Sequence, residues 1–350
     1  MPFNSTQIEQ IGHYAINDFA KNDPVDQINS KHTLFSWLVA NKEERAAVGQ
    51  FYSENIYVSN DSNGQNYFGA DQVTYNSRDP VRQTQWAWYN YHNGFGFDED
   101  TLRAAGIIKT DDREAVASEA EKSILWNRLK AAYMSVKEGT QNDLAIEFYR
   151  DGTQSTKAVP GVSHIISTSP AAGTVGGVAA SNPYWQNNTA LSIVTTTPTD
   201  GNINTALKRM ERAVTRYAGV RPDRIFAGQA FIEALEKENR AISHLNVTMD
   251  NSGRGTTYDG GTASTYFNGV PVIWDPTLDQ IDAIDSTTTW SKRAYMVSSK
   301  ALRLRPVSGF WMLDRKPPRV YDRYVHYFAR TNSYRLTTDR RNGLAVLSIA

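Results

Sequence analysis

The clearest hydrophobic pattern in the chain is a single apolar stripe along residues 110–138. The residues that recur at helical spacing are Val116, Ala120, Ile124, Leu129, Tyr133 and Val136. Thr110 can cap the start of this helix and Gly139 can close its end. Such a helix would be a rod of about 43 Å, well beyond the globular average. A second, shorter helix is predicted over residues 141–150.

A different pattern occupies residues 51–92. Phe51–Ser59 has the composition of a strand, a long polar and turn-rich stretch follows, and an aromatic run closes the segment at residues 86–91, WAWYNY. Two strand-like ends around a polar middle predict an extended hairpin. Because an isolated hairpin is marginally stable in water, it needs a surface to lie on.

Helical and strand patterns then alternate between residues 203 and 305. Helices are predicted over 203–218 and 229–240, and the predicted strands are 225–227, 270–274, 294–297 and 301–305. This alternation indicates a mixed α/β module. The outer face of its first helix is basic, with Lys208, Arg209, Arg212 and Arg216. We expect this face to be solvated or to pair with acids on a neighbouring molecule, and direct DNA binding is the alternative.

The two ends of the chain give further elements. Residues 5–21 and a segment from Thr33, TLFSWLVANKEERAAV, predict amphipathic or apolar helices with little core of their own. They would pack on the rest of the chain or on a neighbouring molecule. At the other end, strands Tyr324–Leu336 and Leu344–Ile349 flank a turn signal at residues 339–343. This spacing predicts that the two strands pair, with the rod helix as an attractive partner.

Composition excludes several classes of protein. The 350 residues include 37 basic and 37 acidic side chains, so the chain lacks the overall basic excess typical of proteins that grip DNA non-specifically. There is no cysteine, which excludes disulfides and thiolate zinc sites. The N-terminal residues do not form a signal peptide, and no apolar run approaches the roughly 18 residues of a membrane span. We therefore expect a soluble protein without a membrane partner.

No catalytic constellation emerges from the sequence. The six histidines are scattered, and there is no His-Glu-x-x-His, Gly-x-Ser-x-Gly or phosphate-loop motif, although residues 160–200 are rich in glycine. Asp275, Asp279, Asp282 and Asp285 could bind a hard cation, but a solvated loop or short helix is favoured. For Trp86, Trp88 and Tyr89 a buried core or subunit contact is favoured over nucleic-acid stacking, because no Lys or Arg is interleaved. The sequence thus predicts no catalytic residue, cofactor or metal.

Six phrases, the fifth of them in two parts, resemble in their order along the chain the major capsid proteins of tailed bacteriophages. They are TLFSWLVANKEERAAVGQFYSENIYVS, QWAWYNYHNGFGFDEDTLRAAG, GTQNDLAIEFYRDGTQ, GTVGGVAASNPYWQN, YFNGVPVIWDP with AYMVSSKALRLRP, and RTNSYRLTTDRRNGLAVLSI. The resemblance implies an α+β fold with a long spine helix backed by a sheet. Its implied parts are an N-terminal arm (1–50), an extended loop (51–93), a peripheral domain (94–157) with a spine helix at 110–138, an axial domain (158–305) and a return to the peripheral domain (306–350).

The same resemblance implies a structural, non-enzymatic role. Copies would assemble as pentamers and hexamers into an icosahedral shell that holds double-stranded DNA without sequence specificity, formed in the bacterial host cytoplasm and retained in the virion. Because only about 50 residues precede the loop, we expect a separate scaffolding protein, together with a portal and a decoration protein. An encapsulin-like compartment shell is the alternative, and a hydrolase or nucleotide-binding enzyme built on residues 160–305 is a third interpretation. Arg78, Asp79 and Arg82 on the loop are predicted to make contacts between subunits.

Overall fold

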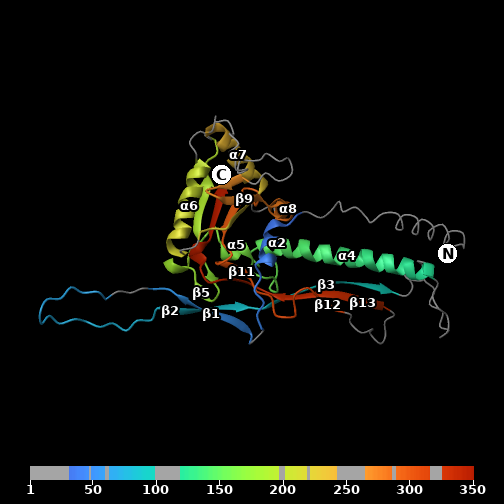
Figure 1. Ribbon diagram of the computed structural model, residues 1–350, viewed down its shortest axis with the longest axis horizontal. Coiled ribbons are helices and arrows are strands. Elements are labelled where there is room, and N and C mark those ends of the chain that lie inside the picture. The colour runs from blue at the N-terminus through green and yellow to red at the C-terminus, as the bar shows by residue number, and fades with distance from the viewer. Residues whose placement is uncertain are drawn as a thin grey trace, which may run out of the picture. The chain divides into compact units, whose positions relative to one another are not determined.

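The computed structural model describes residues 31–46, 49–59, 63–98, 119–196, 202–218, 221–242, 265–285, 289–315 and 325–350 (Figure 1). The chain divides into two compact units. The described residues of the smaller unit are drawn from Asn90–Asp143 and Gly309–Ser333, and the larger unit comprises Lys31–Tyr89, Leu144–Ser308 and Tyr334–Ala350. The five-part division expected from the sequence stays a prediction, and its helix at residues 5–21 lies outside the described residues.

A six-stranded mixed sheet is the centre of the larger unit. Its strand order is β6 (Asn188–Ile193), β15 (Ala345–Ile349), β10 (Arg293–Val297), β7 (Arg224–Ala227), β9 (Val270–Trp274) and β8 (Thr265–Phe267). The pairs β6–β15 and β7–β9 are parallel and the other three are antiparallel. The strands predicted at residues 225–227, 270–274 and 294–297 are therefore confirmed within this sheet.

Helices cover both faces of this sheet. On one face, α6 (Asn202–Ala218) and α7 (Gln229–Ile242) bury Leu207, Val214 and Phe231 against alternate strand residues (Figure 1). On the other face, Phe226 packs on Trp37 of α2 (Thr33–Ala40) with ring centroids 5.7 Å apart. The alternation of the strand residues thus divides the apolar side chains between two layers.

A short helix follows β9, and the aspartate that caps it also binds the helix α2 of that second layer. Asp275 caps α8 (Pro276–Ile284) by accepting a hydrogen bond from the Thr277 amide at 3.0 Å, with proline in the first turn. Its other carboxylate oxygen accepts from the Leu34 amide at 2.8 Å and from the Tyr149 hydroxyl at 2.9 Å. The short helix expected near these aspartates is present, and the buried carboxylate ties together three elements.

The extended hairpin predicted from the sequence is confirmed. Strands β1 (Phe51–Tyr57) and β2 (Val81–Ala87) pair antiparallel from Phe51 opposite Ala87 to Tyr57 opposite Val81. Residues 63–80 continue beyond them without regular strand structure (Figure 1). We call residues 63–80 the loop tip and the paired strands with the side chains that hold them the loop root.

The smaller unit places part of a long helix on a three-stranded sheet. Strand β13 (Val325–Tyr334) lies between β12 (Leu313–Arg315) and β3 (Tyr89–Asp98), and the described parts of β13 and β3 in this unit stack Phe328 on Phe95 at 5.3 Å. Tyr133 of α4 (Glu119–Tyr149) packs edge-on against Phe328 at 5.4 Å. The long helix and the role of the terminal strand as its partner are confirmed for the described residues.

Two expectations about these elements are wrong. Helix α4 does not end at Gly139 but continues to Tyr149, so the segment predicted as a second helix over residues 141–150 is the last part of the same helix. The Thr140 hydroxyl donates a hydrogen bond to the Val136 carbonyl at 2.7 Å. Beyond it, Leu144 and Phe148 are completely buried. The free energy gained by burying these side chains exceeds the roughly 1 kcal/mol by which a glycine destabilises a helix.

The two C-terminal strands also do not pair with each other. β15 lies between β10 and β6, while β14 (Leu336–Thr338) pairs with β11 (Leu302–Leu304), the strand expected at residues 301–305. The turn signal at residues 339–343 forms the 3₁₀ turn η3 (Arg341–Gly343). Arg341 is buried and donates to the carbonyls of Ile165, Pro170 and Trp185, which diverts the chain into a different sheet.

The remaining elements are short. They are α5 (Val162–Ile165), the paired strands β4 (Thr174–Val175) and β5 (Val178–Ala179), and the 3₁₀ helix η1 (Pro183–Trp185). Among the described helices, none combines the length and the apolar character needed to cross a bilayer.

Candidate functional site: the extended loop

The loop root has one buried face and one exposed face. Along β1 the side chains of Tyr52, Glu54 and Ile56 face inward, and along β2 those of Thr84 and Trp86 are buried. Trp86 lies against Gly176, where an added Cβ would approach its ring to 2.7 Å and where φ is +58°. Only glycine accommodates both conditions, so the β4–β5 turn forms a seat for this tryptophan.

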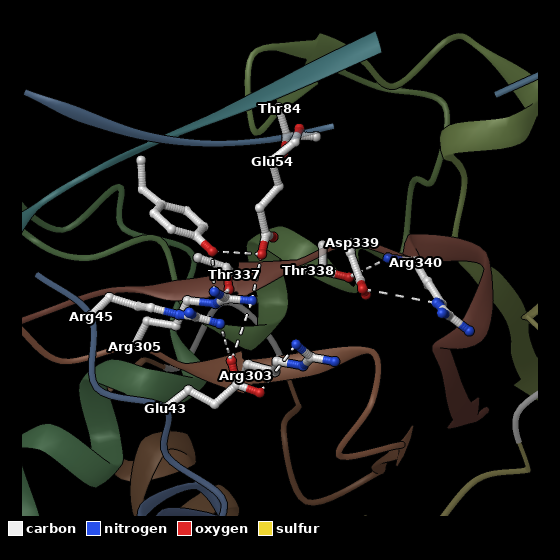
Figure 2. A network of polar contacts seen from close by, with 11 residues as sticks. Glu43, Arg45, Glu54, Thr84, Arg303, Arg305, Thr337, Thr338, Asp339 and Arg340 are labelled. Atoms are coloured by element: carbon white, nitrogen blue, oxygen red, sulfur yellow. Dashed lines mark hydrogen bonds and ion pairs between the residues drawn. The ribbon is translucent and has the colours of Figure 1, made fainter. Parts of the chain in front are cut away.

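Arg305 is the centre of the polar contacts that hold the root (Figure 2). Its side chain is 1% exposed, and its guanidinium pairs with Glu54 at 2.5 Å and with Glu43 at 3.6 Å. It also donates to the Thr337 hydroxyl at 2.9 Å and to the Tyr52 hydroxyl. Figure 2 shows Glu54 and Glu43 approaching the guanidinium from two sides, one from β1 and the other from the segment after α2.

The segment after α2 differs from the sequence prediction. The helix predicted from Thr33 ends at Ala40, and its charged continuation is not helical. Instead, the amide of Glu43 donates to the Leu304 carbonyl at 2.9 Å and that of Arg45 to the Pro306 carbonyl at 3.0 Å. Glu43 then pairs with Arg303 at 3.1 Å as well as with Arg305. The ion pairs and backbone bonds available here explain why the helix stops.

A second buried arginine is stacked between aromatic rings of the root. The guanidinium of Arg335 lies 3.9 Å from the Tyr52 ring centroid and 3.6 Å from that of Trp88, and it donates to the Trp86 carbonyl at 3.1 Å. Burial, with a contribution from nearby Arg305, lowers the pKa of Arg335 to about 9. The group therefore stays charged at neutral pH, and cation–π contacts replace the hydrogen bonds that its Nε and Nη2 atoms lack.

The loop tip has a contrasting surface. Phe68 is 89% exposed, Tyr75 is 91% exposed and Tyr67 is 69% exposed. The tip is held by local hydrogen bonds, including Phe68 amide to Asp71 carboxylate at 2.9 Å and Thr74 amide to the Gln65 side chain at 3.1 Å. These contacts shape the turn but bury none of its three aromatic rings.

The predicted contact residues lie on or next to this tip. Arg78 and Asp79 are exposed on the tip and Arg82 is exposed on β2. Asp79 and Arg82 form an ion pair with each other, which raises the pKa of Arg82. Their role between subunits stays a prediction. Sequence reasoning missed the buried Arg305 and Arg335 and also the exposed aromatic side chains, although three large aromatics in a polar loop were a visible signal.

A cavity of about 320 Å³ opens beside β1, next to the η1 and η3 turns. Its lining includes Tyr57, Tyr184, Asp339 and Arg340. Burial raises the pKa of Asp339, which lies 3.9 Å from Arg340. Arg341 in the same wall already holds three backbone carbonyls. These charged groups serve the local turn, and their arrangement does not resemble a nucleophile–base pair.

The aspartates considered for a cation have protein partners. Asp279 accepts from the Trp274 indole at 2.7 Å and the Gln229 amide at 3.1 Å, and Asp282 accepts from the Ser291 amide at 2.9 Å. Together with the Asp275 cap, these bonds give three of the four residues a structural role. In the part of the chain that the structure describes, no group of three or more potential metal-ligating side chains occurs.

Comparison with solved structures decides the fold. The chain is similar to a subunit of the cyanophage A-1(L) capsid asymmetric unit, with a TM-score of 0.58, 10% identity and coverage of 94% of this chain and 96% of that one. The capsid of Myoviridae phage XM1 gives a TM-score of 0.53, 10% identity and coverages of 94% and 95%. This chain has the tailed-phage capsid fold.

The capsid fold extends over nearly the whole chain. A structure from Microbacterium phage Oxtober96 gives a TM-score of 0.55 at 9% identity and covers 94% of each chain. No family model matches the sequence, and the search of curated proteins gives no match. The likeness is therefore one of architecture, and it confirms the α+β capsid fold expected from the six phrases.

Proposed function

We propose that this protein is the major capsid protein of a tailed phage. Its copies assemble as pentamers and hexamers into an icosahedral head that encloses double-stranded DNA. The role is structural and non-enzymatic. The observation that carries the proposal is the capsid fold over 94% of the chain, combined with an extended loop whose tip exposes three aromatic side chains.

The state of the loop tip supports contact with a second copy. Burying one large apolar side chain contributes roughly 1.5–3 kcal/mol. Covering the three exposed rings with a second copy would therefore stabilise the contact between the copies strongly. Aromatic residues that enter pockets dominate most protein interfaces. Arg78 and Asp79 lie on the same tip and Arg82 follows on β2, and all three would contribute to the polar rim of the contact.

The remaining partners follow from the proposed role. A separate scaffolding protein and a portal are expected during assembly, and a decoration protein is a further candidate. Assembly would take place in the cytoplasm of the bacterial host, and the product would reside in the virion. Zero formal net charge is compatible with close association of many copies, because overall self-repulsion is small.

Negative-stain electron microscopy of the purified protein tests the proposal directly. The protein is examined alone and after co-expression with the products of neighbouring genes. Uniform closed shells, formed alone or only with a scaffold, are the expected result. Monomers or small oligomers under every condition would contradict it.

A matched pair of variants makes the test specific to the loop. Replacing Tyr67, Phe68 and Tyr75 with serine should prevent closed shells while the purified subunit keeps its melting temperature. Replacing the exposed residues Gln72, Ser77 and Gln83 with alanine changes the same loop without removing an aromatic ring, and this control should assemble. Equal assembly of both variants would remove the loop tip from the proposed contact.

A further inference from the structure

The outer face of α6 carries a continuous basic stripe. Lys208, Arg209 and Arg212 are exposed, and Arg216 follows one turn later on the same face. They lie opposite Ile203, Leu207, Met210 and Val214, which are buried against the sheet. We call these four basic residues the basic stripe. At 1.5 Å per residue it is about 12 Å long.

The charge of this stripe is not balanced within the helix. Glu211, the single acid of α6, is turned aside and pairs with Arg221 at 3.1 Å and with the Asn268 amide group at 2.7 Å. Among the described residues, Lys208, Arg209 and Arg212 have no ion pair or side-chain hydrogen bond. Like charges spaced three and four apart destabilise a helix by roughly 0.2–0.5 kcal/mol per pair. Repulsion among Lys208, Arg209 and Arg212 therefore favours the binding of an anionic partner to this part of the stripe.

The side chains on the outer face of α6 indicate which class of anionic partner it binds. Over residues 202–216, where the side chains of this helix are described, the exposed ones are the basic stripe with Thr205 and Thr215, and none of them is an apolar anchor for a protein interface. Guanidinium groups match phosphate oxygens geometrically. DNA carries one phosphate per about 3.4 Å along each strand, so the stripe spans three or four phosphates.

We propose that the outer face of α6 binds the phosphate backbone of nucleic acid without reading its sequence. Backbone contacts of this kind need only cations at phosphate spacing, which the stripe provides. If copies of the chain form a shell, this face would be turned toward the packaged DNA. This last step rests on the proposed function. The zero net charge of the whole chain does not oppose this, because the positive charge is concentrated on one helix face.

Fluorescence anisotropy of a labelled 20-base-pair DNA duplex, titrated with the purified protein at several salt concentrations, tests the proposal. The stripe variant is K208Q/R209Q/R212Q. The matched control, K157Q/R224Q/K300Q, removes three exposed basic residues elsewhere on the same unit. Circular dichroism melting verifies that both variants fold.

The expected result is a change in salt dependence confined to the stripe variant. Losing three phosphate contacts should reduce the slope of log affinity against log salt by about 2.7. Between 50 and 200 mM salt, the unmodified protein and the control should therefore lose roughly 40-fold more affinity than the stripe variant. Equal slopes for the stripe variant and the control, or no DNA binding by the unmodified protein, would overturn the proposal.

Microscopy of the same samples separates this inference from the proposed function. Normal shells of the stripe variant together with weakened DNA binding support both. Absence of shells from the unmodified protein would count against the proposed function, while the DNA titration would still decide the role of the stripe. If the stripe variant lost assembly and kept DNA affinity, the partner would be an acidic surface of a neighbouring copy, and the nucleic-acid proposal would be wrong.

Discussion

The root and the tip of the extended loop belong to one hairpin but have opposite surfaces. At the root, Arg305 and Arg335 are 1% exposed and are surrounded by carboxylates, hydroxyls and aromatic rings. At the tip, Phe68 and Tyr75 are about nine-tenths exposed. The root is completed by contacts within its own subunit, whereas the tip has apolar surface that its subunit leaves uncovered.

This difference indicates that the loop root and the loop tip have different roles. Breaking a buried ion pair by removing one partner typically costs 3–5 kcal/mol, so the root is part of what stabilises the subunit. Exposed aromatic rings contribute almost nothing to the stability of a monomer. Changes at the root should therefore affect folding, and changes at the tip should affect association.

The largest expected effect comes from the tip. The variant Y67S/F68S/Y75S removes three side chains whose burial between copies would contribute on the order of 5 kcal/mol or more per loop. Sedimentation velocity should show loss of assembled particles, with association weakened by a factor of about 1,000 or more. The melting temperature of the subunit should stay within about 1 °C of that of the unmodified protein. A large drop in melting temperature would place these rings in the subunit's own core and break the contrast.

The next effect comes from the root. Replacing Arg305 with alanine removes the buried partner of Glu54, whose own side chain is 17% exposed, and should lower the free energy of unfolding by about 3–5 kcal/mol. Urea unfolding followed by tryptophan fluorescence measures this change. As a control, Arg45 to alanine removes an exposed cation that pairs with Glu43 at 3.1 Å and should cost less than about 1 kcal/mol. Equal costs for the two variants would mean that Arg305 adds no more than a surface pair.

Much of the fold was predictable because local patterns and burial agree. The hairpin, the strands at residues 225–227 and 270–274 and the helix α6 follow from alternation and helical periodicity. The rod helix was predictable in kind but not at its C-terminal end. Gly139 is a helix terminator by local propensity, and only the burial of Leu144 and Phe148 shows why the helix continues.

The root could not be predicted for a physical reason. Arg305 is the last residue of the alternating segment Leu-Arg-Leu-Arg at 302–305, a pattern that predicts an exposed arginine, yet it is buried and pairs with Glu54 and Glu43 from distant parts of the sequence. Pairing partners of this kind depend on tertiary structure. The tip, by contrast, could have been found: Tyr67, Phe68 and Tyr75 stand in a polar stretch where nothing nearby can cover them.

A moderate effect is expected at the glycine turn that seats Trp86. Gly176 to alanine combines a positive φ with a Cβ 2.7 Å from the indole, so it should destabilise the subunit by about 2–3 kcal/mol. Gly173 to alanine has a similar φ of +76° but no neighbour within 4 Å, so it should cost only about 1 kcal/mol. The difference between the two melting curves isolates the contact with the root. Equal losses would mean that backbone strain alone matters.

The smallest effect is expected for the charged residues next to the tip. Exposed ion pairs contribute about 0–1 kcal/mol, and Asp79 and Arg82 already pair with each other within one chain. The variant R78A/D79A/R82A should therefore reduce assembly by less than about tenfold and leave subunit melting unchanged. The reduction should vanish above about 0.5 M salt, because exposed charges are screened there. Normal particle yield at low salt would mean that these charges make no contact between copies, and the aromatic side chains alone would then account for docking of the tip.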